Sequence, residues 1–248
     1  MRLIPLEIGR LESDNRFLSG EDGWKTLPVP SWLIEHPDGL ILFDTGLHAD
    51  LQQSSDRLGP GAAVFRPDFE PGEELASQLA ARDIRASDIT HIIFSHLHFD
   101  HAGGTEEIPD ARVIIQEAEW KSAHHERLIE AGVYNPADYN HGHDLQTITG
   151  THDVFNDGKV ACLPTPGHTA GHQSLRLELD SGPHVLTADC VYFGAWLDEM
   201  RVPQMGYNHD LQRESMEELV RLRDQEGCHL LFGHDAQQFR SLAPEGVT

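Results

Sequence analysis

Hydrophobic residues along the chain fall into short runs that polar and glycine-rich segments separate, and most runs are rich in β-branched side chains. This pattern is typical of strands. The run Ile89–Phe94 has no polar alternation after His91, which indicates a buried strand. The other strands expected from the pattern are Ser31–Glu35, Leu40–Phe43, Arg112–Ile115, Val160–Leu163, Gln173–Leu179, His184–Thr187 and His229–Phe232.

Two segments have the helical period instead. Pro71–Ala80 carries a one-sided apolar stripe, and Asp210–Asp224 does the same with Asp210 as the expected N-cap. Strands mixed with helices predict an α/β protein in which helices cover sheets. Residues 1–248 are expected to form a single domain, and residues 124–150, which lack a clean period, are expected to be a surface insertion.

The net charge of the chain indicates which kinds of partner it can bind. The chain has 18 Lys and Arg against 41 Asp and Glu, a net charge of −23, and no local basic patch. A surface of this kind repels nucleic acid and suits a neutral small molecule. The three cysteines have no CxxC spacing, and neither a signal peptide nor a membrane span is expected, so a cytoplasmic location is the default expectation.

The segment Ser95–Gly104 carries the candidate chemistry directly after the Ile89–Phe94 strand. His96 and His98 are two residues apart, so an extended chain would direct both imidazoles to one side. Asp100 and His101 follow where two glycines are expected to let the chain turn tightly. Imidazole and carboxylate are ligands that Zn²⁺ accepts. In a chain with 17 histidines, this motif alone also fits a solvated histidine-rich loop.

Three further elements strengthen the metal interpretation. His168 lies on a glycine-rich turn after one expected strand, Asp189 ends the next strand, and His234 follows the last one. Each residue alone is more often a surface or core residue, but their shared position at strand ends favours one site. The remaining histidines are expected to be exposed loop residues without a metal role: His124, His125, His141, His143, His172 and His209.

This ordered set resembles the motifs of the metallo-β-lactamase superfamily over residues 30–235. The resemblance implies an αββα sandwich with a two-metal site at one edge, between two sheets. It assigns His96, His98 and His168 to one metal, and Asp100, His101 and His234 to the second, with Asp189 bridging both. It also implies that Asp44, in Phe43–Gly46, supports the metal loop without binding metal.

Within the superfamily, the chain is similar to the N-acyl-homoserine lactonases. Phe99 lies inside the metal motif, Tyr192 follows Asp189 by three residues, and Phe69–Leu75 leads into a helix as in that family. The resemblance implies that a metal-bridging hydroxide opens the lactone ring. Tyr192 would then stabilise the oxyanion and Asp100 would transfer the proton. Tyr192, Phe99 and Trp24 are the expected substrate contacts, and Phe17 and Leu18 could line an acyl-chain groove with them.

The resemblance also implies cofactors and leaves alternatives open. Two divalent metal ions are expected, with Zn²⁺ first and Mn²⁺, Fe²⁺ or Co²⁺ compatible with the same ligands. The expected partner is a small lactone, and a homodimer fits the family likeness. The main alternative is a thioester hydrolase of the glyoxalase II type, or another ester or lactone hydrolase of the superfamily. A non-catalytic or redox dimetal protein is the alternative of a different class. The net charge disfavours a phosphodiesterase or nuclease, and the absent export signal disfavours a β-lactamase.

Overall fold

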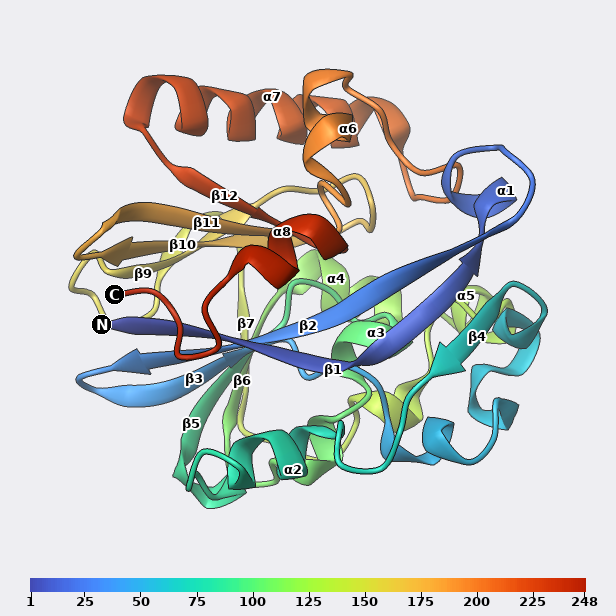
Figure 1. The fold of residues 1–248 in the computed structure, drawn as a ribbon, viewed down its shortest axis with the longest axis horizontal. Coiled ribbons are helices and arrows are strands. Elements are labelled where there is room, and N and C mark those ends of the chain that lie inside the picture. Colours follow the sequence, from blue (N-terminus) through green and yellow to red (C-terminus); the bar gives the residue numbers. More distant parts are fainter.

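The computed structural model describes residues 1–248, whose strands build two mixed sheets that face each other (Figure 1). The first sheet has seven strands in the order β4-β1-β2-β3-β5-β6-β7. Its strands are β1 (Arg2–Asp14), β2 (Trp24–His36), β3 (Gly39–Phe43), β4 (Phe65–Asp68), β5 (Ile89–Ile93), β6 (Arg112–Gln116) and β7 (Leu145–Ile148). The second sheet has five strands in the order β12-β11-β10-β9-β8. These are β8 (His152–Asp153), β9 (Val160–Pro164), β10 (Gln173–Leu179), β11 (Gly182–Ala188) and β12 (His229–Phe232).

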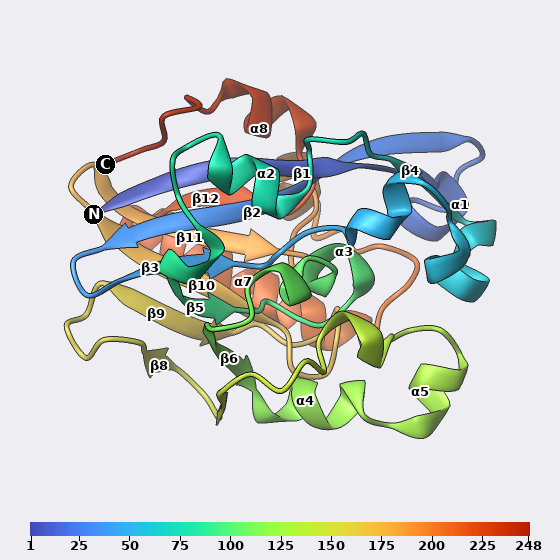
Figure 2. The same ribbon diagram turned by 90° about the horizontal axis from the view of Figure 1, so that it is seen from below.

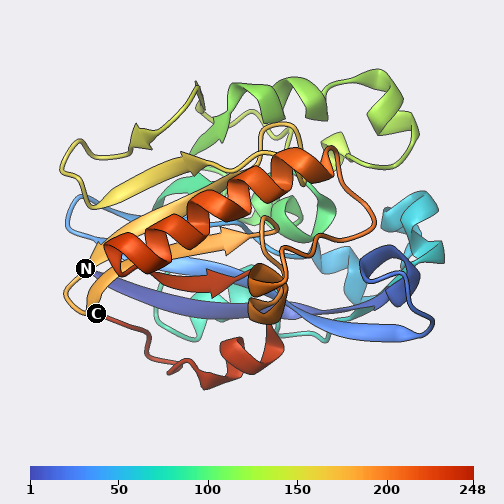
Figure 3. The same ribbon diagram turned by 90° about the horizontal axis from the view of Figure 1, so that it is seen from above.

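Helices cover the outer face of each sheet. α7 lies along the outside of the second sheet with α6 beside it (Figure 3), and α2, α3 and α4 lie on the side of the first sheet (Figure 2). The helices are α1 (Asn15–Leu18), α2 (Leu75–Ala80), α3 (Phe99–Ala102), α4 (Glu117–Ala123), α5 (Glu126–Glu130), α6 (Gly194–Asp198), α7 (His209–Glu226) and α8 (Ala236–Ser241). The result is the expected αββα sandwich.

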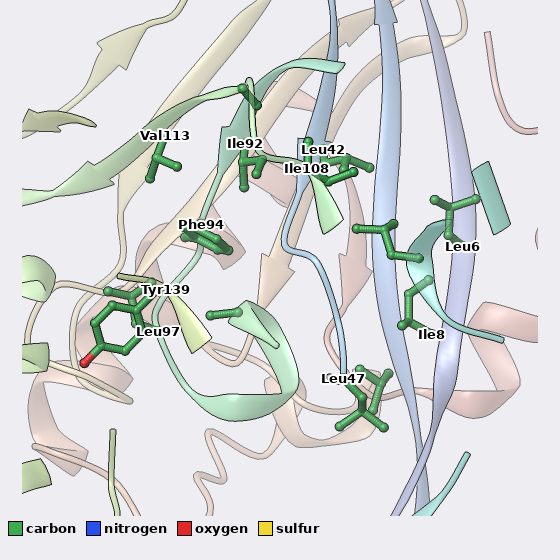
Figure 4. Packing of buried hydrophobic residues seen from close by; sticks show 14 of the residues in the cluster. Leu6, Ile8, Leu42, Leu47, Ile92, Phe94, Leu97, Ile108, Val113 and Tyr139 are labelled. Carbon is green, nitrogen blue, oxygen red and sulfur yellow. The ribbon is translucent and has the colours of Figure 1, made fainter. Parts of the chain in front are cut away.

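Three main layers of buried side chains hold the sandwich together. Side chains such as Ile41 and Leu175 fill the space between the two sheets. Leu6, Ile92 and their neighbours pack between the first sheet and its helices (Figure 4). Val185 and the apolar stripe of α7 form the third layer. Burying these side chains removes apolar surface from water, which is the main force that stabilises a domain of this size.

The expected strands all form, but the sequence pattern missed four others, which are β1, β4, β7 and β8. β1 and β4 lie at one edge of the first sheet, and β1 extends along nearly the whole of β2. The N-cap of α7 is Asn208 and not Asp210, because the Asn208 side chain accepts hydrogen bonds from the backbone N–H groups of Asp210 and Leu211.

Residues 124–150 are only partly a surface segment. β7 pairs with β6 and so extends the first sheet, and Tyr134 and Tyr139 are buried in the core beneath it. Two aromatic rings therefore fix this segment to the body of the protein. No helix in the structure has both the length and the apolar character that crossing a bilayer requires.

Candidate metal centre

Parallel strand pairs bring the candidate ligands to one edge of the sandwich. Phe43 at the end of β3 is level with Ile93 at the end of β5, which places Asp44 beside Ser95. In the other sheet, Ala188 of β11 is level with Phe232 of β12. The chain segments that leave these four strands carry Asp44, the His96 loop, Asp189 and His234, so the register assembles them at a common edge.

The loop with the first histidines is clamped against Asp44–Gly46. Thr45 N–H donates to the carbonyl of His101 at 2.7 Å, and Gly103 N–H donates to the carbonyl of Gly46 at 2.8 Å. Gly103 is not in a left-handed conformation. A Cβ there would lie 2.3 Å from the backbone nitrogen of His48, so glycine permits close approach of two backbones and not the tight turn that was expected.

The His168 loop is held from the other side by α7. Gly167 has φ of +135°, and a Cβ at this position would lie 2.2 Å from the backbone nitrogen of Gln212. Gln212 is fully buried and its Nε2 donates to the carbonyls of Asp189 and Cys190 at 3.0 and 3.1 Å. One side chain of α7 therefore fixes the backbone of the central aspartate.

Three imidazoles form the first ligand group. His96 Nε2 lies 3.0 Å from His98 Nδ1, and His168 Nε2 lies 3.1 Å from the same Nδ1. The potential ligand atoms of these three residues all lie within 4.8 Å of one another. The second group has the same compactness and consists of Asp100, His101 and His234.

Asp189 lies between the two groups and presents one oxygen to each. Its Oδ2 is 3.3 Å from His168 Nε2 and 3.9 Å from His96 Nε2. Its Oδ1 is 3.2 Å from His101 Nε2 and 3.1 Å from His234 Nε2. A carboxylate in this position can ligate one cation with each oxygen.

The potential ligand atoms are arranged to bind a pair of cations and not to form hydrogen bonds with one another. His101 Nε2 and Asp189 Oδ1 are buried, yet neither makes a hydrogen bond. Leaving buried polar atoms without partners is costly, so an unmatched pair at the centre of a cluster requires an explanation. Imidazole and carboxylate groups converging in this way are the donor set of Zn²⁺ and similar divalent ions. The superfamily's divalent metal ions therefore suit the residues that are present.

Neighbouring acceptors orient the imidazoles. Nδ1 of His101 lies 2.8 Å from Asp44 Oδ2, and Nδ1 of His234 lies 2.8 Å from the carbonyl oxygen of Pro28. Each acceptor holds the proton on Nδ1 and leaves Nε2 free to ligate. Asp44 also accepts from the backbone N–H and hydroxyl of Ser95, both at 2.7 Å. Asp44 therefore contacts both Ser95 and His101 of the loop that carries the first histidines.

Burial lowers the pKa of the histidines at this site, whereas the neighbouring carboxylates raise it. Burial lowers the pKa of His96 and His168 well below its usual value, which favours the neutral, ligating form. For His101, burial alone would also lower the pKa, but the carboxylates of Asp189, Asp100 and Asp44 outweigh it and raise the pKa. The carboxylates of Asp100 and Asp44 therefore make the surroundings of the second group more negative than those of the first.

A cavity of about 560 Å³ opens beside the ligand cluster. Of its 27 lining residues, 16 are hydrophobic, and none is Lys or Arg. Phe99 and Tyr192, two of the expected substrate contacts, line it, and so do Phe17 and Leu18. Trp24 does not belong to the lining, and its ring lies under the guanidinium of Arg66 at 3.6 Å, so the expectation that Trp24 contacts substrate finds no support.

Tyr192 lies between the ligands and the apolar wall. Its ring centroid is 4.9 Å from that of His234 and 5.8 Å from that of His168. Burial raises the pKa of Tyr192 well above its usual value, and the carboxylates of Asp189 and Asp100 add to the effect. The phenol therefore keeps its proton and is available as a hydrogen-bond donor.

His172 corrects one expectation and Glu119 was missed entirely. His172 is fully buried behind the first ligand group, with its ring 5.3 Å from that of His96, and is not an exposed loop residue. Glu119 is a fully buried carboxylate that contacts both ligand loops. No sequence motif marks Glu119, because its role depends on where helix α4 packs.

Comparison with known proteins agrees with this geometry. Residues 24–234 match the family model described as the metallo-beta-lactamase superfamily. An N-acyl homoserine lactonase from a Bacillus species is 34% identical over 219 residues, covering 86% of this chain and 84% of that protein. The N-acyl homoserine lactonase AttM from Rhizobium johnstonii is 28% identical, covering 99% and 98%.

A solved structure has the same fold over nearly its whole length. It is an N-acyl homoserine lactone hydrolase with the product N-hexanoyl-L-homoserine bound at its catalytic metal centre. Its TM-score to this chain is 0.90 at 28% identity, covering 99% of this chain and 98% of the other. The chain belongs to the metallo-beta-lactamase superfamily and, within it, to the family of the N-acyl homoserine lactonases.

Proposed function

We propose that this protein hydrolyses the lactone ring of N-acyl homoserine lactones. The observation that carries the proposal is the position of Asp189, whose two oxygens face two separate ligand groups at the floor of an apolar cavity. No Lys or Arg lines the cavity, so no cationic side chain is available there to pair with an anionic substrate, and a neutral acyl lactone needs none. The relatives named above act on or bind molecules of this class.

The ligand assignment follows from the two compact groups. His96, His98 and His168 would hold one divalent ion, and Asp100, His101 and His234 would hold the other, with Asp189 within reach of both groups. The mixture of imidazole and carboxylate favours Zn²⁺. Two such ions supply Lewis acidity at the carbonyl and a water molecule that is acidic enough to react at neutral pH.

Asp100 and Tyr192 are the residues proposed to act on the substrate directly. Asp100 lines the cavity, so its carboxylate can receive the proton of the attacking water and deliver it to the ring oxygen. When the water oxygen joins the carbonyl carbon, the π electrons of the C=O bond move to the carbonyl oxygen, and their return breaks the bond from that carbon to the ring oxygen. The Tyr192 hydroxyl donates to the carbonyl oxygen while negative charge develops there. The product is an N-acyl homoserine with a new carboxylate and a new hydroxyl.

The acyl chain is assigned to the apolar wall. Phe65 and Phe99 are in aromatic contact, with ring centroids 5.4 Å apart, and both line the cavity. Leu128 and Val133 line it from the segment that follows α4. A chain of methylene groups that leaves water for this wall gains about 0.8 kcal/mol per buried group, so the wall favours long acyl chains.

We further propose that residues 1–248 act as one domain. Ligands come from both sheets, and Leu3 near the start of the chain pairs with Val247 through backbone hydrogen bonds of 2.8 Å in both directions. Neither sheet carries a complete ligand set by itself.

The proposed function is tested by incubating metal-loaded protein with a short-chain or a long-chain N-acyl homoserine lactone. Ring opening is measured by the proton that the new carboxylic acid releases. We expect rapid ring opening that His96→Ala abolishes. A glutathione thioester serves as the competing substrate. Turnover of the thioester without turnover of either lactone would overturn the substrate assignment and leave the metal site intact.

A further inference from the structure

We propose that Glu119 is a positioning residue whose single carboxylate sets the geometry of the first ligand group by holding both of its loops. Oε1 accepts a hydrogen bond from the backbone N–H of Leu97 at 3.1 Å. Oε2 accepts from the hydroxyl of Thr169 at 2.6 Å and from the backbone N–H of Gly171 at 3.1 Å. Leu97 stands between His96 and His98, and Thr169 directly follows His168.

A fourth donor extends this network to the cavity wall. The hydroxyl of Tyr134 donates to Oε1 of Glu119 at 2.9 Å. Tyr134 lines the cavity, and its ring centroid is 5.4 Å from that of His98. The carboxylate thus joins two ligand loops and one wall of the cavity, which otherwise belong to separate parts of the chain.

The four hydrogen bonds to Glu119 require an ionised carboxylate, and no other side chain can accept all of them. Glu119 is fully buried, and burial raises the pKa of its carboxyl while the four hydrogen bonds oppose that rise. Two of the donors are backbone N–H groups, which can only donate. An amide side chain would turn an NH₂ group toward one of them, so only a carboxylate satisfies all four.

A glycine in the His168 loop lets this loop lie close to Glu119. Glu119 lies in the first turn of the short helix α4, and the loop with Gly171 passes directly against that turn. A Cβ at position 171 would lie 2.0 Å from the backbone nitrogen of Glu119. Glycine at this position therefore allows the loop to approach the carboxylate.

The contacts of Glu119 are confined to one ligand group. His101 and His234 of the other group are oriented by Asp44 and by the carbonyl of Pro28 instead. Loss of Glu119 should therefore weaken the binding of one metal ion and leave the second ion in place. This selectivity separates a positioning role from a general contribution to folding.

The test is metal binding by Glu119→Gln, measured without any substrate. Metal-free wild type and variant are titrated with Co²⁺ and followed by visible absorption, and Zn²⁺ affinities are obtained by competition with a chromogenic chelator. We expect two ions bound in both proteins. In the variant, we expect one of them to bind roughly 10- to 100-fold more weakly, the usual effect of removing a group that orients metal ligands.

Asp138→Asn is the matched control. Asp138 is also a buried carboxylate, paired with Arg57 at 2.8 Å, and it makes no hydrogen bond to a ligand loop. We expect this variant to lose thermal stability while it keeps both metal affinities. Wild-type affinity for both ions in Glu119→Gln, together with a loss of stability like that of Asp138→Asn, would overturn the proposal.

A milder variant covers the case in which Glu119→Gln does not fold. Thr169→Val removes one of the four donors at nearly constant volume, and we expect a several-fold loss of affinity for one ion. Unchanged affinity in Thr169→Val would then count against the proposal.

The inference rests on the proposed metal site but not on the proposed substrate. A wild type that binds no metal would refute the site, whereas one that binds metal but opens no lactone would refute only the substrate.

Discussion

Asp44 and His101 are 57 residues apart in the chain, yet Asp44 Oδ2 and His101 Nδ1 lie 2.8 Å apart at the edge of the first sheet. The contact follows from the parallel register of β3 and β5, which ends both strands at the same level. Asp44 has φ of +61°, a left-handed conformation that Asp tolerates better than most residues. The imidazole held in this way directs Nε2 toward Asp189.

Asp44→Asn should weaken metal binding at the group that contains His101. The amide can still accept from Ser95, but its NH₂ group would face Nδ1 of His101 and favour the tautomer that protonates Nε2. We expect a loss of about 10- to 100-fold in the affinity for one Zn²⁺, measured by chelator competition. Ser31→Ala is the control, since it removes a neutral hydrogen bond of 2.7 Å to the carbonyl of Asp44. Equal affinities in wild type and Asp44→Asn would contradict the assigned role.

Tyr192→Phe should slow ring opening without loss of metal. Removing one hydrogen-bond donor to a developing oxyanion costs on the order of 10²-fold in kcat. Because the ring remains, we expect little change in metal content, which atomic absorption would measure beside the lactone kinetics. Tyr139→Phe is the control, since the hydroxyl of Tyr139 donates to the carbonyl of Ala123 at 2.6 Å and does not reach the ligands. A fully active Tyr192→Phe would assign the tyrosine to packing alone.

Removal of metal should destabilise the protein as well as inactivate it. Seven ligand residues surround a compact region, and at metal concentrations about 100-fold above Kd each site contributes about 3 kcal/mol to the free energy of unfolding. We expect Tm to fall by on the order of 10 °C after chelation and to recover when Zn²⁺ is restored. Differential scanning calorimetry with and without chelator measures this. A Tm that does not depend on metal would mean that the cluster holds no ion in solution.

Substitution in the apolar wall should discriminate between acyl chains. Val133 is 40% exposed at the cavity, so Val133→Asp places a charge against the acyl chain at little cost to folding. We expect KM to rise several-fold for a long-chain lactone and much less for a short-chain one. Trp24→Ala, a change outside the cavity lining, should alter neither value. Equal effects of Val133→Asp on both substrates would place the acyl chain elsewhere.

Glu74 should make stability depend on pH in the acid range. Partial burial alone would raise its pKa, but hydrogen bonds from Ser77, Gln52 and nearby backbone N–H groups lower the pKa to about 2. A folded-state pKa below the unfolded value gives stability that is present above about pH 4.5 and is lost as pH falls toward 2.

Glu74→Gln tests this dependence. Chemical denaturation at pH 7 should show a loss of about 1 kcal/mol, and the difference from wild type should shrink between pH 4.5 and pH 3. Glu70→Gln is the comparison, since only backbone atoms of Glu70 take part in the hydrogen bonds near α2. A difference for Glu74→Gln that stays constant with pH would mean that its carboxylate is not the stabilising group.

The sequence predicted the metal-ligand candidates because each lies at the end of a recognisable strand, where the hydrophobic pattern stops. His96, Asp189 and His234 all follow this rule. The same reasoning failed for His172, since the burial of a loop residue is not encoded in local periodicity. Glu119 was beyond reach, because its four donors come from segments that only the packing of α4 brings together.

The proposed ligands come from segments as distant as His96 and His234, and Asp189 lies between groups from both sheets. A ribosome releases these segments in order, so a growing chain first exposes three histidines and an aspartate with no complete coordination sphere. High-affinity binding has to wait until both halves of the sandwich have docked. On the proposed ligand assignment, high-affinity metal binding would therefore mark completed folding, and an unfinished or misfolded chain would bind metal more weakly than the native protein.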